Sequence, residues 1–111
     1  EVGNIVLKEI SSIIKRCVRD VDLFARYGGE EFAVILPQTG VGEAHRIGER
    51  IRDQVEKTVV DAGAAGKLRV TVSVGISSFP ENGKSHEELV TVADQALYKA
   101  KGEGKNLVCV M

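Results

Sequence analysis

Cysteine is scarce in this sequence, which holds two among 111 residues, Cys17 and Cys109. Two thiols so far apart in the chain are too few for a metal framework built on several cysteine ligands. Small domains that are stapled by disulfides carry more cysteines than this. We therefore expect both residues to pack as small apolar groups and not to form a bridge.

An excess of charge of either sign is also missing. Fifteen Lys and Arg oppose sixteen Asp and Glu, for a net charge of −1, so sequence-independent binding to a nucleic acid backbone is disfavoured. No apolar run approaches the roughly 18 to 20 residues that cross a bilayer, and residues 1 to 14 lack a signal-peptide pattern. We expect a soluble, cytoplasmic domain, with membrane tethering of a parent protein left open. A chain of 111 residues that is 43% hydrophobic suits a single domain.

Apolar residues recur at three- and four-residue steps in three stretches, as is typical of amphipathic helices. The stretches are residues 5 to 18, Ala44 to Val59 and Leu89 to Ala100. Ser85 and Glu88 precede the third stretch in the pattern of a capping box. We predict three helices from these patterns.

The remaining apolar stretches predict strands. Leu23 to Tyr27 and Phe32 to Leu36 flank a glycine pair, which suits a tight hairpin, and the second stretch is apolar without alternation, as in a central strand covered on both faces. Leu68 to Ile76 alternates with period two, and Asn106 to Val110 can add a last strand. The predicted order is helix, hairpin, helix, strand, helix, strand, which is a mixed α/β domain.

The glycine turn carries two acidic residues, Glu30 and Glu31, directly after Gly28 and Gly29. Bare glycine backbone lets a nucleotide approach the main chain, and a carboxylate supplies the hard oxygen ligand that Mg²⁺ prefers. Because side chains alternate along a strand, we expect one of the two acids to face the site and the other to make structural contacts. An ordinary hairpin with solvated acids explains the same residues.

A basic and an acidic residue, Arg19 and Asp22, stand three positions apart just before the hairpin. A guanidinium can fork onto guanine or phosphate, and a carboxylate can accept from the guanine N–H groups. Arg46 and Arg50 on the next helix either extend such an anion site or pair with acids of their own helix. A basic residue near the end of the first helix also compensates the helix dipole.

Two lysines, Lys101 and Lys105, flank the end of the third helix and a glycine. Contact with a phosphate and compensation of the helix dipole both favour lysine here. Their spacing does not separate the two interpretations.

Taken together, these residues resemble a known family. Gly28-Gly29-Glu30-Glu31-Phe32 resembles the signature of the GGDEF family, the bacterial diguanylate cyclases, in its GGEEF form. Arg19 to Asp22 resembles the family's RxxD inhibitory site, at the family's five-residue spacing from the signature. The TxSxGI strand and the ADxALYxAKxxGRN closing segment are matched by Val72 to Ile76 and by Ala93 to Asn106.

The resemblance implies a ferredoxin-like α/β fold similar to the palm of nucleotidyl cyclases and polymerases. It implies the condensation of two GTP into cyclic di-GMP with release of pyrophosphate. The implied cofactor is Mg²⁺, two ions per active site, or Mn²⁺ in its place. Two GGDEF domains, each with one GTP, would face each other in a homodimer. A sensory or receiver domain would control them in the parent chain, and no nucleic acid is implied as a partner.

The resemblance also implies roles for individual residues. Glu30 would be catalytic and would hold the metal, with Glu31 beside it. The remaining substrate-binding positions, in the order of the chain, would be Asn4, Gly28, Gly29, Lys101 and Lys105. The product-binding inhibitory site would comprise Arg19, Asp22 and Arg50.

The sequence departs from the family pattern in two places. The family's first strand, with its second metal-binding Asp, has no counterpart here, so we expect residues 1 to 111 to be a single GGDEF domain without its N-terminal strand, and to turn over little or no GTP alone. Asn4 stands where the family has Asp, and an amide does not present two acceptor oxygens to guanine. The specificity for GTP is thereby placed in question.

Two alternatives remain open. A GGDEF domain without catalysis would act as a regulatory module that binds GTP or cyclic di-GMP, and Asn4 favours this interpretation. An RNA-binding domain of similar fold would stack bases on aromatic residues of its sheet. The longest predicted strand instead presents Arg69, Thr71 and Ser73, none of them aromatic.

Overall fold

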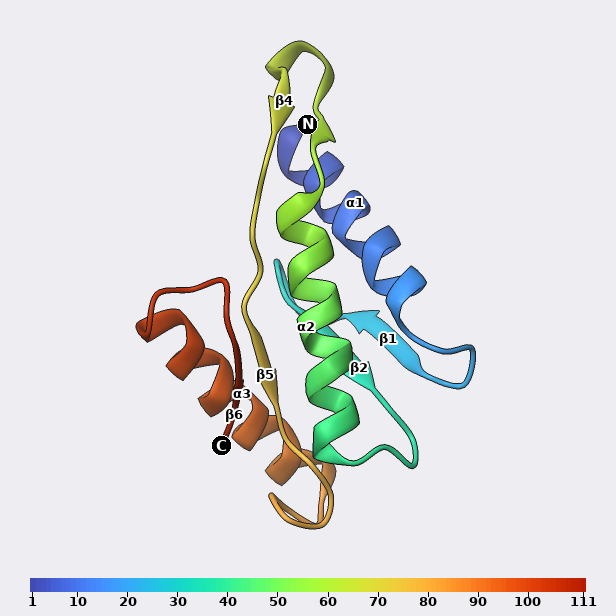
Figure 1. Ribbon diagram of the computed structural model, residues 1–111, viewed down its shortest axis with the longest axis vertical. Coiled ribbons are helices and arrows are strands. Elements are labelled where there is room, and N and C mark those ends of the chain that lie inside the picture. Colours follow the sequence, from blue (N-terminus) through green and yellow to red (C-terminus); the bar gives the residue numbers. More distant parts are fainter.

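The computed structural model describes residues 1–111 as a mixed α/β fold of three α-helices, six short strands and a 3₁₀ turn. Helix α2 runs along the middle of the elongated molecule, with α1 beside it and the first hairpin behind it (Figure 1). The predicted element order is confirmed, with one additional hairpin. The elements are α1 (Val2–Cys17), β1 (Leu23–Arg26), β2 (Phe32–Ile35), α2 (Val41–Lys57), β3 (Val60–Asp61), η1 (Gly63–Ala65), β4 (Lys67–Leu68), β5 (Val74–Ile76), α3 (His86–Gly102) and β6 (Val108–Val110).

The main core lies between α1 and α2. Both helices turn their apolar stripes inward, and burial of these side chains stabilises the pair at about 25 cal/mol for each Å² removed from water. One face of the β1–β2 hairpin packs against this core through Phe24, Phe32 and Val34. The buried members of this core are Ile10, Ile13, Ile14, Cys17, Ile47, Ile51 and Val55.

The glycine pair does form a hairpin, but the turn is wider than predicted. β1 and β2 pair antiparallel, with Leu23 opposite Ile35 and Arg26 opposite Phe32. Five residues therefore lie between the paired ends. Only Gly28 of the glycine pair has a positive φ, of 76°.

β2 is not the doubly covered central strand that its apolar sequence predicted. Its residues alternate between half-buried and exposed, and Ile35 is 52% exposed. β2 pairs with β1 alone, in a sheet of two strands. Helices cover one face of this sheet and leave the other open, so an apolar run here does not indicate burial on both faces.

The long strand predicted from Leu68 to Ile76 is paired only at its ends. β4 pairs antiparallel with β3, and β5 pairs parallel with β6, as Val74 opposite Val108. The residues between β4 and β5 belong to no ladder. The apolar residues of this segment alternate because Val70 and Val72 pack against the main core. Extended backbone places every second side chain on one face even without a partner strand.

Helix α3 covers the β5–β6 pair on the side away from α2 (Figure 1). Its start confirms the predicted cap, because the Ser85 hydroxyl accepts from the Glu88 N–H at 3.1 Å. Ala96 and Ala100 are fully buried against the strands. These small side chains allow the helix and the strands to approach closely.

Both cysteines are free, as expected, and Cys17 is buried in the main core. Burial raises the pKa of the Cys17 thiol. None of the helices is both long and apolar enough to cross a bilayer.

Candidate functional site

The turn between β1 and β2 is open and carries its acids outward. Arg26 Nε donates to the Gly29 carbonyl at 3.0 Å, and the Tyr27 N–H donates to the Glu31 carbonyl at 2.7 Å. A Cβ atom added to Gly28 or Gly29 would meet nothing within 4 Å. A ligand can therefore approach the main chain of both glycines directly.

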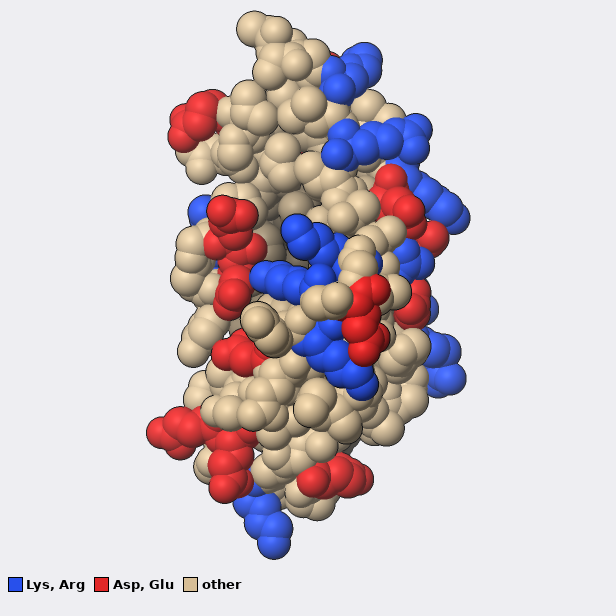
Figure 2. Space-filling view, turned by 90° about the vertical axis from the view of Figure 1, so that its left-hand side faces the viewer, with Lys and Arg blue, Asp and Glu red and all other residues tan.

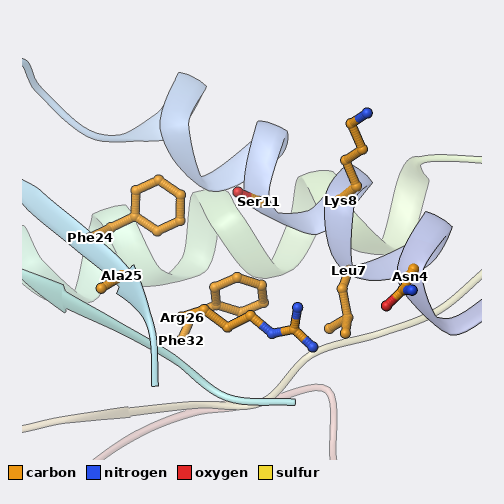
Figure 3. Close-up of a pocket in the computed structure, with 8 residues that line it drawn as sticks. All are labelled: Asn4, Leu7, Lys8, Ser11, Phe24, Ala25, Arg26 and Phe32. Carbon is orange, nitrogen blue, oxygen red and sulfur yellow. The ribbon is translucent and has the colours of Figure 1, made fainter. Parts of the chain in front are cut away.

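A hollow of about 440 Å³ lies between α1 and the hairpin, beside this turn. Asn4, Leu7, Lys8 and Ser11 line it from α1, and Phe24, Ala25, Arg26 and Phe32 line it from the strands (Figure 3). Arg26 extends from β1 toward Leu7, and the two phenylalanine rings lie with their centroids 6.2 Å apart. An apolar floor with a few polar groups at its rim suits a small planar ligand.

Asn4 lines this hollow from the first turn of α1. Its side-chain amide donates to Glu1 Oε2 at 3.0 Å within the first turn of α1. The fold thus brings Asn4 and the residues around the glycine turn to one hollow, although more than twenty positions separate them in the sequence.

The donor set at the turn fits a divalent cation. Glu30 and Glu31 are exposed, and neither belongs to an ion pair with Lys or Arg. Mg²⁺ usually takes one or two protein carboxylates and completes its shell with phosphate oxygens and water. No cluster of three or more His, Cys, Asp or Glu side chains is gathered in the structure, so the protein's share of such a shell would be these two acids.

Arg19 and Asp22 form a tight pair at the base of the hairpin. Arg19 donates to Asp22 through Nη2 at 2.7 Å, through Nε at 3.1 Å and through its backbone N–H at 2.7 Å. The same Nη2 reaches the Pro37 carbonyl at 3.1 Å and Thr39 Oγ1 at 2.6 Å. The side-chain hydrogen bond from Arg19 lowers the pKa of the buried Asp22 carboxyl.

The arginines of α2 fall into different arrangements. Arg46 is exposed and pairs with Glu43, and this hydrogen bond lowers the pKa of Glu43. Arg50 Nη1 reaches the Cys17 carbonyl at the end of α1, at 3.4 Å. Arg50 therefore lies near the segment that carries Arg19, as a shared anion site would require.

The two lysines lie at the end of α3 and in the loop behind it. Neither Lys101 nor Lys105 belongs to an ion pair or lines the hollow. Figure 2 shows the side of the molecule on which α3 and β6 lie: basic side chains gather over its centre and right, beside a recess, with acidic ones among them at the right and others at the left and toward the lower end. The lysine ammonium groups are free to meet an anion.

Sequence reasoning missed one set of polar contacts and part of the hollow. Arg52 Nη1 donates to Asn106 Oδ1 at 3.1 Å across 54 positions, a contact that no local pattern signals. The contribution of Lys8 and Ser11 to the hollow follows from the helical spacing with Asn4, which places all three toward one side of α1.

Comparison with known proteins agrees with this arrangement. The family model described as "Diguanylate cyclase, GGDEF domain" matches residues 1–107, and the chain belongs to this family. Diguanylate cyclase A of Treponema denticola is 46% identical over 107 residues, which are 96% of this chain and 28% of that protein. The chain spans 24% to 30% of the length of the first curated relatives that it matches.

Solved structures agree as well. The active GGEEF domain of a diguanylate cyclase from Vibrio cholerae superposes with a TM-score of 0.87 at 28% identity, over 98% of this chain and 68% of that one. The GGDEF domain of DgcB from Caulobacter crescentus, solved in complex with c-di-GMP, superposes with a TM-score of 0.85 at 32% identity, over 95% of this chain and 62% of that one.

Proposed function

We propose that this domain condenses two GTP molecules into cyclic di-GMP with release of pyrophosphate. The observation that carries the proposal is the open glycine turn, which carries two exposed carboxylates and follows the strand that lines a hollow of about 440 Å³, large enough for a small ligand. The family membership and the relatives named as diguanylate cyclases support the same chemistry.

The hollow would hold the guanine, and the turn would hold the phosphates. Asn4 would bind the polar edge of the base, while the rings of Phe24 and Phe32 supply apolar contact. Gly28 and Gly29 leave room for the ribose and phosphates against the main chain. Lys101 and Lys105 would add positive charge toward the phosphates, as point charges on flexible stems.

Glu30 and Glu31 would hold Mg²⁺, or Mn²⁺ in its place. When bound, such an ion neutralises phosphate charge and lowers the pKa of a hydroxyl that it binds. Glu30 would keep the 3′-hydroxyl of the ribose oriented for in-line attack on the α-phosphate of the other nucleotide.

The reaction requires a second domain, because each domain carries one glycine turn and would hold one nucleotide there. We therefore infer a homodimer of GGDEF domains in which two hollows face each other, in a longer protein whose sensory or receiver module controls the pairing. We expect this chain by itself to turn over little or no GTP, because a single domain would hold only one of the two nucleotides that the reaction joins.

Cyclic di-GMP would inhibit through Arg19, Asp22 and Arg50. Asp22 holds the Arg19 guanidinium in a fixed orientation. Because this side chain is already ordered, the binding of a guanine or phosphate ligand costs less side-chain entropy. Part of Arg19 remains solvent-exposed, so a ligand can reach it.

The test is mass-spectrometric detection of cyclic di-GMP after incubation with GTP and Mg²⁺, in this chain and in any longer protein of which it is a part. We expect the longer protein to make product and its Glu30→Ala variant to make none. Glu87→Ala, an exposed acid at the start of α3, is the matched control and should stay active. Equal product from the Glu30→Ala variant would refute the role of the turn.

A regulatory module that binds nucleotide without catalysis is the second candidate. Asn4 favours it, because its amide nitrogen is engaged by Glu1 and one carbonyl oxygen remains for the base. A folded, dimeric longer protein that makes no product, together with cyclic di-GMP binding that Arg19→Ala abolishes, would select this function.

A further inference from the structure

The loop that carries Lys105 has an unusual backbone. Lys105 and Asn106 both adopt positive φ, of 62° and 53°. A positive φ is costly for any residue with a Cβ atom. The cost is smaller for asparagine, whose short polar side chain can form local hydrogen bonds, and larger for lysine. Neighbouring contacts must therefore hold two consecutive residues in this state.

Three hydrogen bonds hold the loop. The Lys105 N–H donates to the Ala100 carbonyl at 3.0 Å, which closes the end of α3. The Asn106 N–H donates to Ser73 Oγ at 3.1 Å, and Asn106 Oδ1 accepts from Arg52 Nη1 at 3.1 Å. Asn106 is thus the junction between α2, the segment before β5 and the loop after α3.

Arg52 is itself fixed for this contact. Its side chain is 18% exposed, and Glu49 and Glu56 accept from its Nε and Nη1 at 2.9 and 3.0 Å. The hydrogen bond to Glu49 raises the pKa of Arg52, so the guanidinium keeps its charge. A planar group held from two sides presents its remaining N–H groups in one direction.

We propose that Arg52 and Asn106 are positioning residues: they hold the backbone of Lys105 at the place from which its ammonium group reaches the nucleotide phosphates. This proposal rests on the phosphate-binding role proposed above for Lys105. Arg52 touches no substrate in this arrangement and acts only through Asn106. Its contribution to nucleotide binding should therefore disappear when Lys105 loses its ammonium group.

The test is a double-mutant cycle on GTP binding in the presence of Mg²⁺, measured by isothermal titration calorimetry. Arg52→Gln should weaken GTP binding about threefold to tenfold in the otherwise native protein. It should have no further effect on GTP affinity in the Lys105→Ala background. Asn106→Gly, which keeps the positive φ but removes the amide, should behave like Arg52→Gln. Lys57→Gln is the control, because Lys57 is another basic residue of α2 and pairs only with Asp53.

A second measurement reads the loop without ligand. Amide hydrogen exchange at Asn106 should accelerate in Arg52→Gln and stay unchanged in Lys57→Gln. The positioning role is refuted if Arg52→Gln weakens GTP binding equally in the native and the Lys105→Ala backgrounds. It is also refuted if Arg52→Gln leaves the amide exchange rate of Asn106 unchanged. If Lys105→Ala alone leaves GTP affinity unchanged in a folded protein, the proposed phosphate contact is wrong and the positioning role is overturned with it.

Discussion

Replacing Gly75 with alanine tests the closest approach of α3 to the strands. A Cβ atom at this position would lie 2.2 Å from the Ala93 carbonyl oxygen and 2.4 Å from the Leu97 nitrogen. Both are backbone atoms of a helix, so neither can turn aside. Ordinary van der Waals contact begins near 3.4 Å, and α3 would therefore have to move outward by about 1 Å.

That movement would loosen the packing of the fully buried Ala96 and Ala100 against the strands. We expect Gly75→Ala to lower the free energy of unfolding by about 3 kcal/mol, at the upper end of the overpacking range. In urea unfolding followed by circular dichroism, the midpoint should fall by roughly 1 to 2 M. Gly75 has no positive φ, so the effect would come from the close approach alone.

Gly48 offers a matched control in α2. A Cβ atom there would meet only methyl groups, of Val108, Val74 and Ile76, at 3.3 to 3.5 Å. These side chains can give slightly, and alanine in a helix is favoured over glycine by about 1 kcal/mol. Gly48→Ala should therefore be neutral or stabilising. Unfolding midpoints that are equal in the two variants, or a native midpoint in Gly75→Ala, would refute the reasoning.

Two further predictions concern the hairpin. Asp22→Asn should lower the midpoint of thermal unfolding near neutral pH. Because Arg19 lowers the pKa of Asp22 in the folded state, the ion pair stabilises the protein fully above about pH 4 and loses this effect as the pH falls through the folded-state pKa of Asp22. The difference in melting temperature between the variant and wild type should therefore shrink at low pH. A difference in melting temperature that stays constant from pH 7 to pH 2 would contradict this. Asn4→Asp should strengthen GTP binding about tenfold in titration calorimetry and leave ATP binding unchanged, because a carboxylate can accept hydrogen bonds from both guanine N–H groups. An equal gain in affinity for GTP and ATP would count against a guanine contact at Asn4.

The parts of the fold that the sequence predicts depend on local spacing. Ser85 and Glu88 are three positions apart, and the cap that they form needs nothing from the rest of the chain. The stripes of α1 and α2 recur within each helix, so their buried faces follow from the sequence alone. The family signature likewise lies in contiguous residues, Gly28 to Phe32.

The parts that the sequence does not predict depend on partners distant in the chain. The residues between β4 and β5 alternate like a strand, yet pairing requires a neighbour that no local pattern identifies. The contact of Arg52 with Asn106 arises only when the end of α3 returns to α2. The hollow, similarly, exists because α1 packs over β1 and not because of any residue run.

The hairpin explains why the two candidate sites stand at a fixed spacing. Leu23 to Tyr27, the five residues between Asp22 and Gly28, comprise the four residues of β1 and one residue of the turn. A four-residue strand spans about 13 Å, so a ligand at Arg19 and a nucleotide at the glycine turn occupy opposite ends of β1. At the base, Arg19 joins the segment before β1 to the segment after β2 through Pro37 and Thr39. At the other end, the hydrogen bonds of Arg26 and Tyr27 stay within the turn, and the space beside Gly28 and Gly29 is open. Under the function proposed above, the inhibitor at Arg19 and the nucleotide at the glycine turn would therefore bind at different ends of this strand.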